Sequence, residues 1–322
     1  MQSPRIDTAT KLRYILSIYL ALVFSAVFYM SYFYDGSSIA NYLCKQQELS
    51  RVNDANIEAY SDKMLFGDPI QDLPEEINLN PTSNNEAGFL KTEMIRSVDD
   101  ALILILTLSA WMMLIPRLNR IRYLSFIYLL LGLYLVSLSF FKGMNGGAMF
   151  SELATPAQAT RWLPCFAVWI LLFYRAKTDI QHHSSTLSTV KYLLIIAASL
   201  TFATHGYEAF MEHPKFKDLL YGAFEIISVS PSQTVAITLL KLIGIMDVFL
   251  AVAVIFYHSR WKWLLLWMSA WGFLTAISRP IASGDIGIDD AVLRIGNGAI
   301  PLIVYFIIHY HFQSQQKSYD QT

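Results

Sequence analysis

Two ionisable side chains stand one helical turn apart at the end of an apolar run. His205 and Glu208 are separated by three residues, so on a helix they share one face. An imidazole beside a carboxylate is a common acid–base pair, and a position where hydrocarbon meets water would allow proton exchange. We expect both residues to act as catalytic or proton-relaying groups. The alternative is a structural contact in which the carboxylate only satisfies the histidine.

A third candidate, Asp247, lies near the middle of the next apolar run, in the sequence Gly-Ile-Met-Asp-Val-Phe-Leu. A carboxylate at the centre of a bilayer costs at least about 2.5–3.5 kcal/mol, so it should face the protein interior and have a partner. We expect Asp247 to accept a proton or to orient a ligand. The alternative is an interhelical polar contact that holds the helices together.

Two arginines and an asparagine are expected at the same outer depth as His205. Arg279 closes one apolar run, and Arg294 and Asn297 share a face where the last run opens. With the histidine and the carboxylate they would form an outward-facing polar pocket able to bind an anionic group or a quinone head. We therefore predict Arg279, Arg294 and Asn297 as ligand-binding residues. An ion-paired outer rim is the alternative.

These residues must be positioned by membrane helices, because the chain is too apolar for a typical soluble protein. Of its 322 residues, 54% are hydrophobic and 15% are charged, whereas soluble domains have about 25% charged residues. The net charge of −1 gives no reason to expect a nucleic-acid partner. We expect an all-α integral membrane protein whose principal partner is the lipid bilayer.

Eight apolar runs are predicted to cross the membrane. The first has 21 residues, about 31 Å as a helix, which matches a hydrocarbon core of roughly 30 Å. It is too long for a signal-peptide core, so we interpret it as a retained anchor. The runs are residues 14–34, 101–116, 123–141, 157–174, 192–207, 234–257, 263–277 and 292–312.

The charge distribution predicts the orientation. Residues 35–100 contain thirteen acidic and five basic residues, whereas the rest of the chain contains 12 acidic and 19 basic residues. In the eight-span arrangement the basic turns fall on one side and the acidic segment on the other, so both termini should be cytoplasmic. We expect an inner-membrane protein with a long acidic extracytoplasmic loop at 35–100 and a cytoplasmic tail at 313–322.

The spans divide into two similar sets of four. The first set combines residues 1–34 and 101–185, and the second comprises 186–312; each has a short basic turn between its second and third spans. An even number of spans per set gives the sets the same orientation, a parallel repeat. Tyr32 and Ser109 stand where the second set has His205 and Asp247, so we place the site in the second set.

The two cysteines, Cys44 and Cys165, have no metal-ligand spacing, so no metal site is predicted. A disulfide between them would require both to lie on the outer side, and we favour two unpaired thiols. The sequence also lacks the phosphate-binding, dinucleotide-binding and nucleophile-elbow motifs.

Residues of the second set follow a recognisable order. They are His205-Gly206, Asp247, the stretch Trp-Gly-Phe-Leu-Thr-Ala at 271–276, Arg279-Pro280, and Arg294 with Gly296-Asn297. In this order residues 192–310 resemble the DoxX-like family of bacterial integral membrane proteins, and the first set resembles it only as a diverged repeat. The resemblance implies a four-helix membrane unit. It also implies a link to thiosulfate:quinone oxidoreduction or to oxidant-detoxifying enzymes.

Three functions follow as hypotheses. The leading one is a membrane subunit that binds a quinone or another lipid-like small molecule in the pocket and assists the redox chemistry of a partner. If it is an enzyme, it would be a subunit of a quinone-linked oxidoreductase. The first alternative is an assembly protein that docks a protein partner through its acidic loop. A proton-coupled transporter that uses Asp247 ranks lowest, because the broken helices of many transporters are not evident.

Overall fold

The computed structural model describes residues 8–34, 36–47, 85–118, 121–145, 150–174, 180–226, 228–284 and 287–319. Every regular element in these ranges is a helix, which confirms the all-α prediction. The elements are α1 (Thr8–Phe33), α3 (Asn85–Met112), η2 (Arg122–Ser125), α4 (Phe126–Met144), η3 (Ser151–Leu153), η4 (Pro156–Gln158), α5 (Ala159–Phe173), α6 (Ile180–Phe210), α7 (Pro214–Ile226), α8 (Gln233–Tyr257), α9 (Lys262–Ser283) and α10 (Gly287–Tyr319).

Six helices in the described part of the chain are long and apolar enough to cross a membrane. They lie at 9–47, 123–144, 185–210, 233–257, 262–282 and 287–309. Two further predicted spans, α3 and α5, do not qualify. The apolar part of α3 follows directly on Arg96, Asp99 and Asp100. The 15 residues of α5 extend over only about 22 Å.

The outer surface of α8 is apolar, as expected of a helix that faces lipid. Large apolar side chains recur every three or four residues along it and are exposed, namely Leu242, Ile245, Phe249, Val252 and Phe256. In water such a stripe would be an exposed apolar patch, whereas against hydrocarbon it is in its preferred solvent. The opposite face of α8 carries Gly244 and Asp247, which are buried against the bundle.

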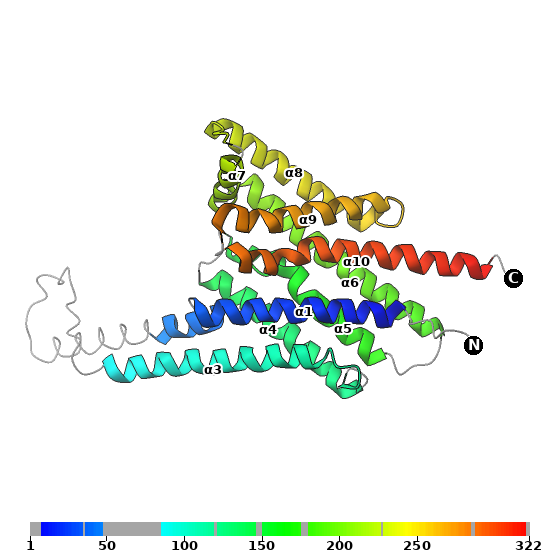
Figure 1. Ribbon diagram of the computed structural model, residues 1–322, viewed down its shortest axis with the longest axis horizontal. Helices are drawn as coiled ribbons and strands as arrows, with labels where there is room; N and C mark the ends of the chain where they lie inside the picture. The colour runs from blue at the N-terminus through cyan, green and yellow to red at the C-terminus, as the bar shows by residue number, and fades with distance from the viewer. Residues whose placement is uncertain are drawn as a thin grey trace, which may run out of the picture.

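The long helices lie side by side, and the two sets of four have matching neighbours (Figure 1). In the first set α1 packs against α3 and α5, and α4 packs against α5. In the second set α6 packs against α8 and α10, and α9 packs against α10. The sets join where α5 contacts α6 and where α1 contacts α10. Matching neighbours are what a repeat would produce, and the parallel repeat itself stays a prediction.

Several helix ends differ from the sequence predictions. The second span was expected to begin at residue 101, but α3 begins at Asn85, because the polar residues before the apolar run include good helix formers. Arg279 does not close its helix, since α9 continues past Pro280 to Ser283. Likewise α10 begins at Gly287, so Arg294 lies two turns inside it. Most of the predicted acidic loop, residues 48–84, falls outside the described residues.

The preferred interpretation of the cysteines is confirmed. Cys44 and Cys165 are both free thiols. Cys165 is buried within α5, where its Sγ lies 3.9 Å from the Arg161 carbonyl oxygen. Cys44 lies near the Thr92 carbonyl oxygen of α3. The two thiols therefore belong to different helix contacts.

Candidate functional site

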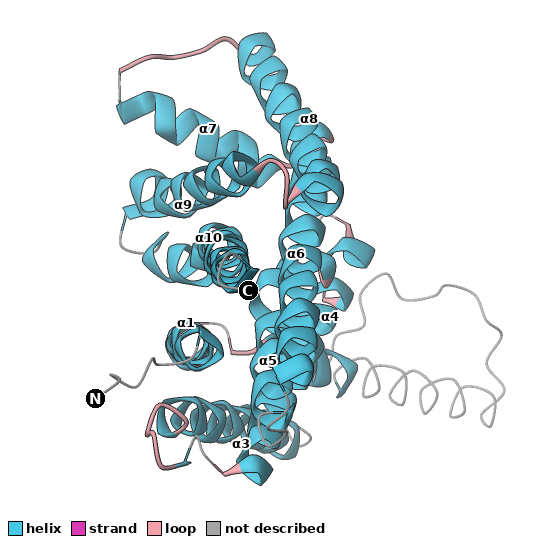
Figure 2. Cartoon of the chain, turned by 90° about the vertical axis from the view of Figure 1, so that its right-hand side faces the viewer, coloured by secondary structure: helices cyan, strands magenta, loops and turns pink. Residues whose placement is uncertain are grey.

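A cavity of about 450 Å³ lies among α6, α7, α8, α9 and α10. Figure 2 shows α7, α9 and α10 on one side of this region and α6 and α8 on the other. Five of the six predicted site residues line the cavity: His205, Asp247, Arg279, Arg294 and Asn297. The sixth, Glu208, is bonded to His205. The structure thus brings the six residues together, and their roles stay predictions.

A glycine contact positions two of these residues. Gly206 on α6 faces Gly244 on α8, and a methyl group at position 206 would lie 2.7 Å from the Gly244 carbonyl oxygen and 2.9 Å from Asp247 Cβ. A methyl group at position 244 would lie 2.5 Å from the Gly206 carbonyl oxygen. Only glycine lets the two backbones approach this closely. The contact places Asp247 of α8 at the same level along the helix bundle as His205 of α6.

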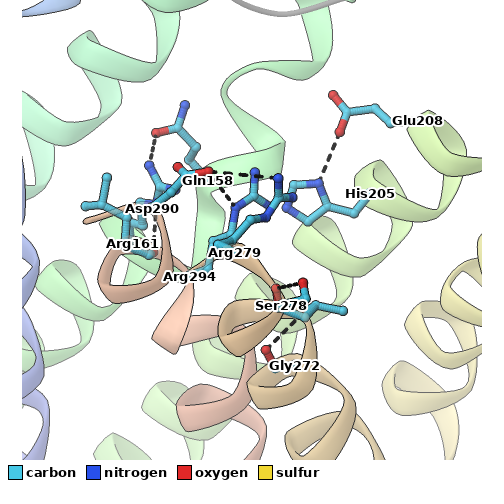
Figure 3. A network of polar contacts seen from close by, with 11 residues as sticks. Gln158, Arg161, His205, Glu208, Gly272, Ser278, Arg279, Asp290 and Arg294 are labelled. Carbon is cyan, nitrogen blue, oxygen red and sulfur yellow. Dashed lines mark hydrogen bonds and ion pairs between the residues drawn. The ribbon is translucent and has the colours of Figure 1, made fainter. Parts of the chain in front are cut away.

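His205 and Glu208 are in contact, as their spacing predicts. His205 Nδ1 lies 3.1 Å from Glu208 Oε2, and both side chains are largely buried. When Nδ1 carries the proton and donates to the carboxylate, Nε2 is left as an acceptor. The imidazole also meets the ring of Phe216 edge to face, with 5.9 Å between centroids. Figure 3 shows the imidazole beside the two arginine head groups.

The two predicted arginines lie next to each other and share one carboxylate (Figure 3). Asp290 Oδ2 is 4.0 Å from Arg279 Nη1 and 3.6 Å from Arg294 Nε. Both separations exceed hydrogen-bonding distance. In the described part of the chain, the buried Nε atoms of both arginines have no hydrogen-bond partner. The cluster therefore retains unused donors that point to a further acceptor.

Asn297 is held by Thr160 of the first helix set, which is itself positioned by Tyr19 and Thr201. Thr160 Oγ1 donates to Asn297 Oδ1 at 3.0 Å, and the Thr160 amide donates to Thr201 Oγ1 at 3.2 Å. The Thr160 carbonyl oxygen accepts from the Tyr19 hydroxyl at 2.9 Å. Because Oδ1 of Asn297 is occupied as an acceptor, its Nδ2 is the atom available to donate into the cavity.

Trp271 is the polar side chain that faces Asp247. Asp247 is 7% exposed, and the Trp271 indole N–H is placed to act on its carboxylate. The contact falls short of full hydrogen-bonding geometry, because Asp247 Oδ1 and Trp271 Nε1 are both buried and neither has a hydrogen-bond partner among the described residues. The expected partner of Asp247 is therefore present only as this loose contact with Trp271. The carboxylate and the indole both keep hydrogen-bonding capacity for a ligand.

Sequence reasoning missed part of the wall. Trp271 was not among the predicted site residues, yet it lines the cavity with Thr275 and Arg279. These three residues are four apart on α9, so they share one face. That spacing was the signal that could have identified them. Asp290, four residues before Arg294 on α10, could have been found in the same way.

A short amphipathic helix completes the wall. This helix is α7, which lies between the predicted spans at 192–207 and 234–257. Its apolar residues Phe216, Leu219, Leu220 and Ala223 line the cavity. They follow the i, i+3, i+4, i+7 pattern of one helix face. Position 222 is glycine because a methyl group there would lie 2.8 Å from Ala282 Cβ on α9.

Comparison of the chain with family models, curated proteins and solved structures found no match. The resemblance to the DoxX-like family therefore stays a prediction. Among the described residues no group of three or more His, Cys, Asp or Glu side chains could hold a metal ion. The chemistry of the site accordingly rests on the cavity and the side chains around it.

One ion-pair cluster ties α7 to the rest of the wall. Glu212 follows α6 with a left-handed φ of 61°, and its carboxylate contacts Lys217 Nζ at 2.9 Å and Lys241 Nζ at 3.1 Å. Lys241 comes from α8 and Lys217 from α7, so the Glu212 carboxylate connects both helices to the end of α6. The hydrogen bonds from Lys217 and Lys241 hold the pKa of the Glu212 carboxyl below its usual range.

We expect Glu212→Gln to loosen α7 without unfolding the bundle. Amide hydrogen exchange should become faster in α7 at neutral pH, because Lys217 and Lys241 no longer have a negatively charged partner at position 212. In the unsubstituted protein the pKa of Glu212 is lowered, so the ion pairs contribute their full stabilisation at pH values above the ordinary carboxyl pKa. This stabilisation is lost as the pH falls through the lowered pKa. Glu225→Gln, at an exposed position on the same helix, is the matched control. Equal exchange in both variants would contradict the prediction.

Proposed function

We propose that this protein is a multi-pass membrane subunit that binds a quinone or another lipid-like small molecule in the cavity and assists the redox chemistry of a partner. The observation that carries the proposal is the cavity's division into an apolar wall and a polar end. The wall is formed by Phe202, Leu219, Leu220, Leu240, Ile243, Leu274 and Ile281, and the polar end by His205, Arg279, Arg294 and Asn297.

The size of the cavity and the chemistry of its lining both favour an amphiphile as the ligand. Small-molecule sites typically have volumes of about 300–1,000 Å³ and are mostly apolar, with a few polar groups that orient the ligand. The cavity of about 450 Å³ fits that description. Arg279, Arg294 and Asn297 would donate hydrogen bonds to the oxygens of the head group. His205, backed by Glu208, and Asp247 would accept or return protons as a bound head group is reduced or oxidised.

The membrane setting completes the proposal. α3 and α5 lie within the bundle beside the helices that are long and apolar enough to span (Figure 1), and we assign them as the remaining two of eight spans. Both termini would be cytoplasmic, and the site would open toward the extracytoplasmic side of the inner membrane. The alternative function, docking of a partner through the acidic loop at 35–100, depends largely on residues outside the described part of the chain.

The test is equilibrium binding of decylubiquinone and of its reduced quinol to the purified full-length protein. We expect Arg279→Ala to lower the affinity for both ligands about tenfold, which corresponds to the loss of one charge-assisted hydrogen bond. We expect Asp247→Asn to weaken the quinol more than the quinone, by about fivefold, because only the quinol has hydroxyl groups to donate to a carboxylate.

Arg260→Ala is the control for these variants, because Arg260 is exposed and lies at the opposite end of α8 and α9. It should bind both ligands as the unsubstituted protein does. Absence of binding by the unsubstituted protein, or equal binding by all variants, would overturn the proposal.

A further inference from the structure

The polar end of the cavity contains more buried positive than negative charge among the described residues. Arg161, Arg279 and Arg294 lie within electrostatic reach of one another and of Asp290. The other nearby carboxylate, Glu208, is engaged by His205. Three guanidinium groups therefore have two carboxylates within reach, of which Asp290 is the one that forms ion pairs with Arg279 and Arg294 among the described residues. A buried charge without a partner is costly, so such a cluster requires a counter-charge.

Arg161 does not obtain that counter-charge from a carboxylate contact of its own. Its Nε donates to the Leu293 carbonyl oxygen at 3.0 Å, and its Nη1 donates to Gln158 Oε1 at 2.8 Å. Both acceptors are neutral. Lys142, at the end of α4, adds another positive charge within reach of Arg161 and Asp290. The surroundings of Asp290 are thus positive on several sides.

The two arginines on the cavity wall have the geometry of an anion site. Arg279 is 7% exposed, and its contact with Asp290 is long, at 4.0 Å. Its Nε and that of Arg294 are buried and have no hydrogen-bond partner in the described ranges. Adjacent guanidinium forks match the oxygens of phosphate and carboxylate groups. Figure 3 shows both head groups directed to the same space as His205.

The apolar wall indicates that the anion belongs to a larger molecule. Leu274 and Ile281 line the cavity and yet are 55% and 48% exposed, so the wall continues to the lipid-facing surface of α9. In Figure 1 α8 tilts away from α9 toward the end where α7 lies. A free anion would make no use of this wall, whereas a hydrocarbon chain could follow it from the cavity into the bilayer.

We propose that the cavity is a binding site for an anionic amphiphile, whose phosphate or carboxylate head lies between Arg279 and Arg294 and whose chain follows the apolar wall between α8 and α9. This inference rests on the proposed function and narrows it. Among lipid-like ligands, those with a charged head are selected over neutral ones, including neutral quinones.

The test compares an anionic amphiphile with a neutral amphiphile of the same chain and with the free anion. Binding of farnesyl phosphate, farnesol and inorganic phosphate is measured on the purified full-length protein. We expect farnesyl phosphate to bind at least about tenfold more tightly than farnesol, because it gains charge-assisted hydrogen bonds. Inorganic phosphate should compete only weakly. Arg279→Gln should abolish the preference while keeping farnesol binding, which also shows that the cavity is intact, and Arg260→Gln should keep the preference.

The outcomes separate this inference from the proposed function. If farnesol or decylubiquinone binds but farnesyl phosphate binds no better, the anionic head is overturned and amphiphile binding stands. If inorganic phosphate competes as strongly as farnesyl phosphate binds, the site takes a free anion and the lipid source is overturned. If no amphiphile binds, both proposals fail. A preference that survives Arg279→Gln would place the anion elsewhere and overturn the assignment to this site.

Discussion

Replacing Asp290 with asparagine is expected to lower the stability of the folded protein by about 1–3 kcal/mol. Removal of one partner from a fully buried ion pair costs about 3–5 kcal/mol. The Asp290 side chain is 38% exposed, so solvent screens part of that cost. The variant leaves Arg279 and Arg294 without the carboxylate that lies 4.0 and 3.6 Å away.

The measurement is the midpoint of reversible denaturation in detergent, with Asp289→Asn as the control. Asp289 is the neighbouring acid on α10 and makes no ion pair with an arginine among the described residues, so its substitution should leave the midpoint nearly unchanged. Equal midpoints for the two variants would show that Asp290 does not balance the arginines. An anionic amphiphile should also raise the midpoint of Asp290→Asn more than that of the unsubstituted protein.

Replacing Gly244 with valine is expected to destabilise the protein by about 3 kcal/mol or more, at the upper end of the range for overpacking. The first added carbon would lie 2.5 Å from the Gly206 carbonyl oxygen and 2.7 Å from the Phe210 amide nitrogen. Both are backbone atoms of α6, so relief requires α6 and α8 to move apart. Because Asp247 lies one turn further along α8, the same movement should weaken ligand binding.

The comparison is with Val252→Leu, which also enlarges a side chain on α8. Val252 is 52% exposed on the lipid-facing surface, so its substitution should change neither the denaturation midpoint nor binding. If Gly244→Val matched this control in both measurements, the close approach of α6 and α8 would not be what positions Asp247.

The residues of the site could be found from the sequence because they break an apolar pattern. A histidine, an aspartate and two arginines within apolar helices or at their ends are costly unless they face the protein interior, so a shared polar site could be expected on energetic grounds. What could not be found was the partner of each. Asp290 falls between the predicted spans at 263–277 and 292–312, and its distance to Arg279 depends on how α9 and α10 cross. Arg161 comes from the first helix set, and no spacing rule links it to Arg294.

The helix boundaries were also predicted only in part from the sequence. The apolar run beginning at residue 101 was a guide to the apolar part of α3 but not to its start at Asn85, since a helix can extend beyond an apolar run wherever its residues favour it. Arg279 was expected to close its run, yet α9 continues past Pro280, because a proline inside a packed apolar helix loses only local hydrogen bonds.

The sequence by itself determined that the chain is helical, that it has helices apolar enough to cross a membrane, and that an aspartate interrupts an apolar run in its second half, because solvent preference and charge cost depend on local composition. Only the tertiary structure decided that His205, Asp247, Arg279, Arg294 and Asn297 line one cavity, that α7 forms part of its wall, and that Asp247 faces Trp271 there. Those facts depend on the approach of α6 to α8 and of α9 to α10. That approach is set by packing between residues far apart in the chain, which no local pattern encodes.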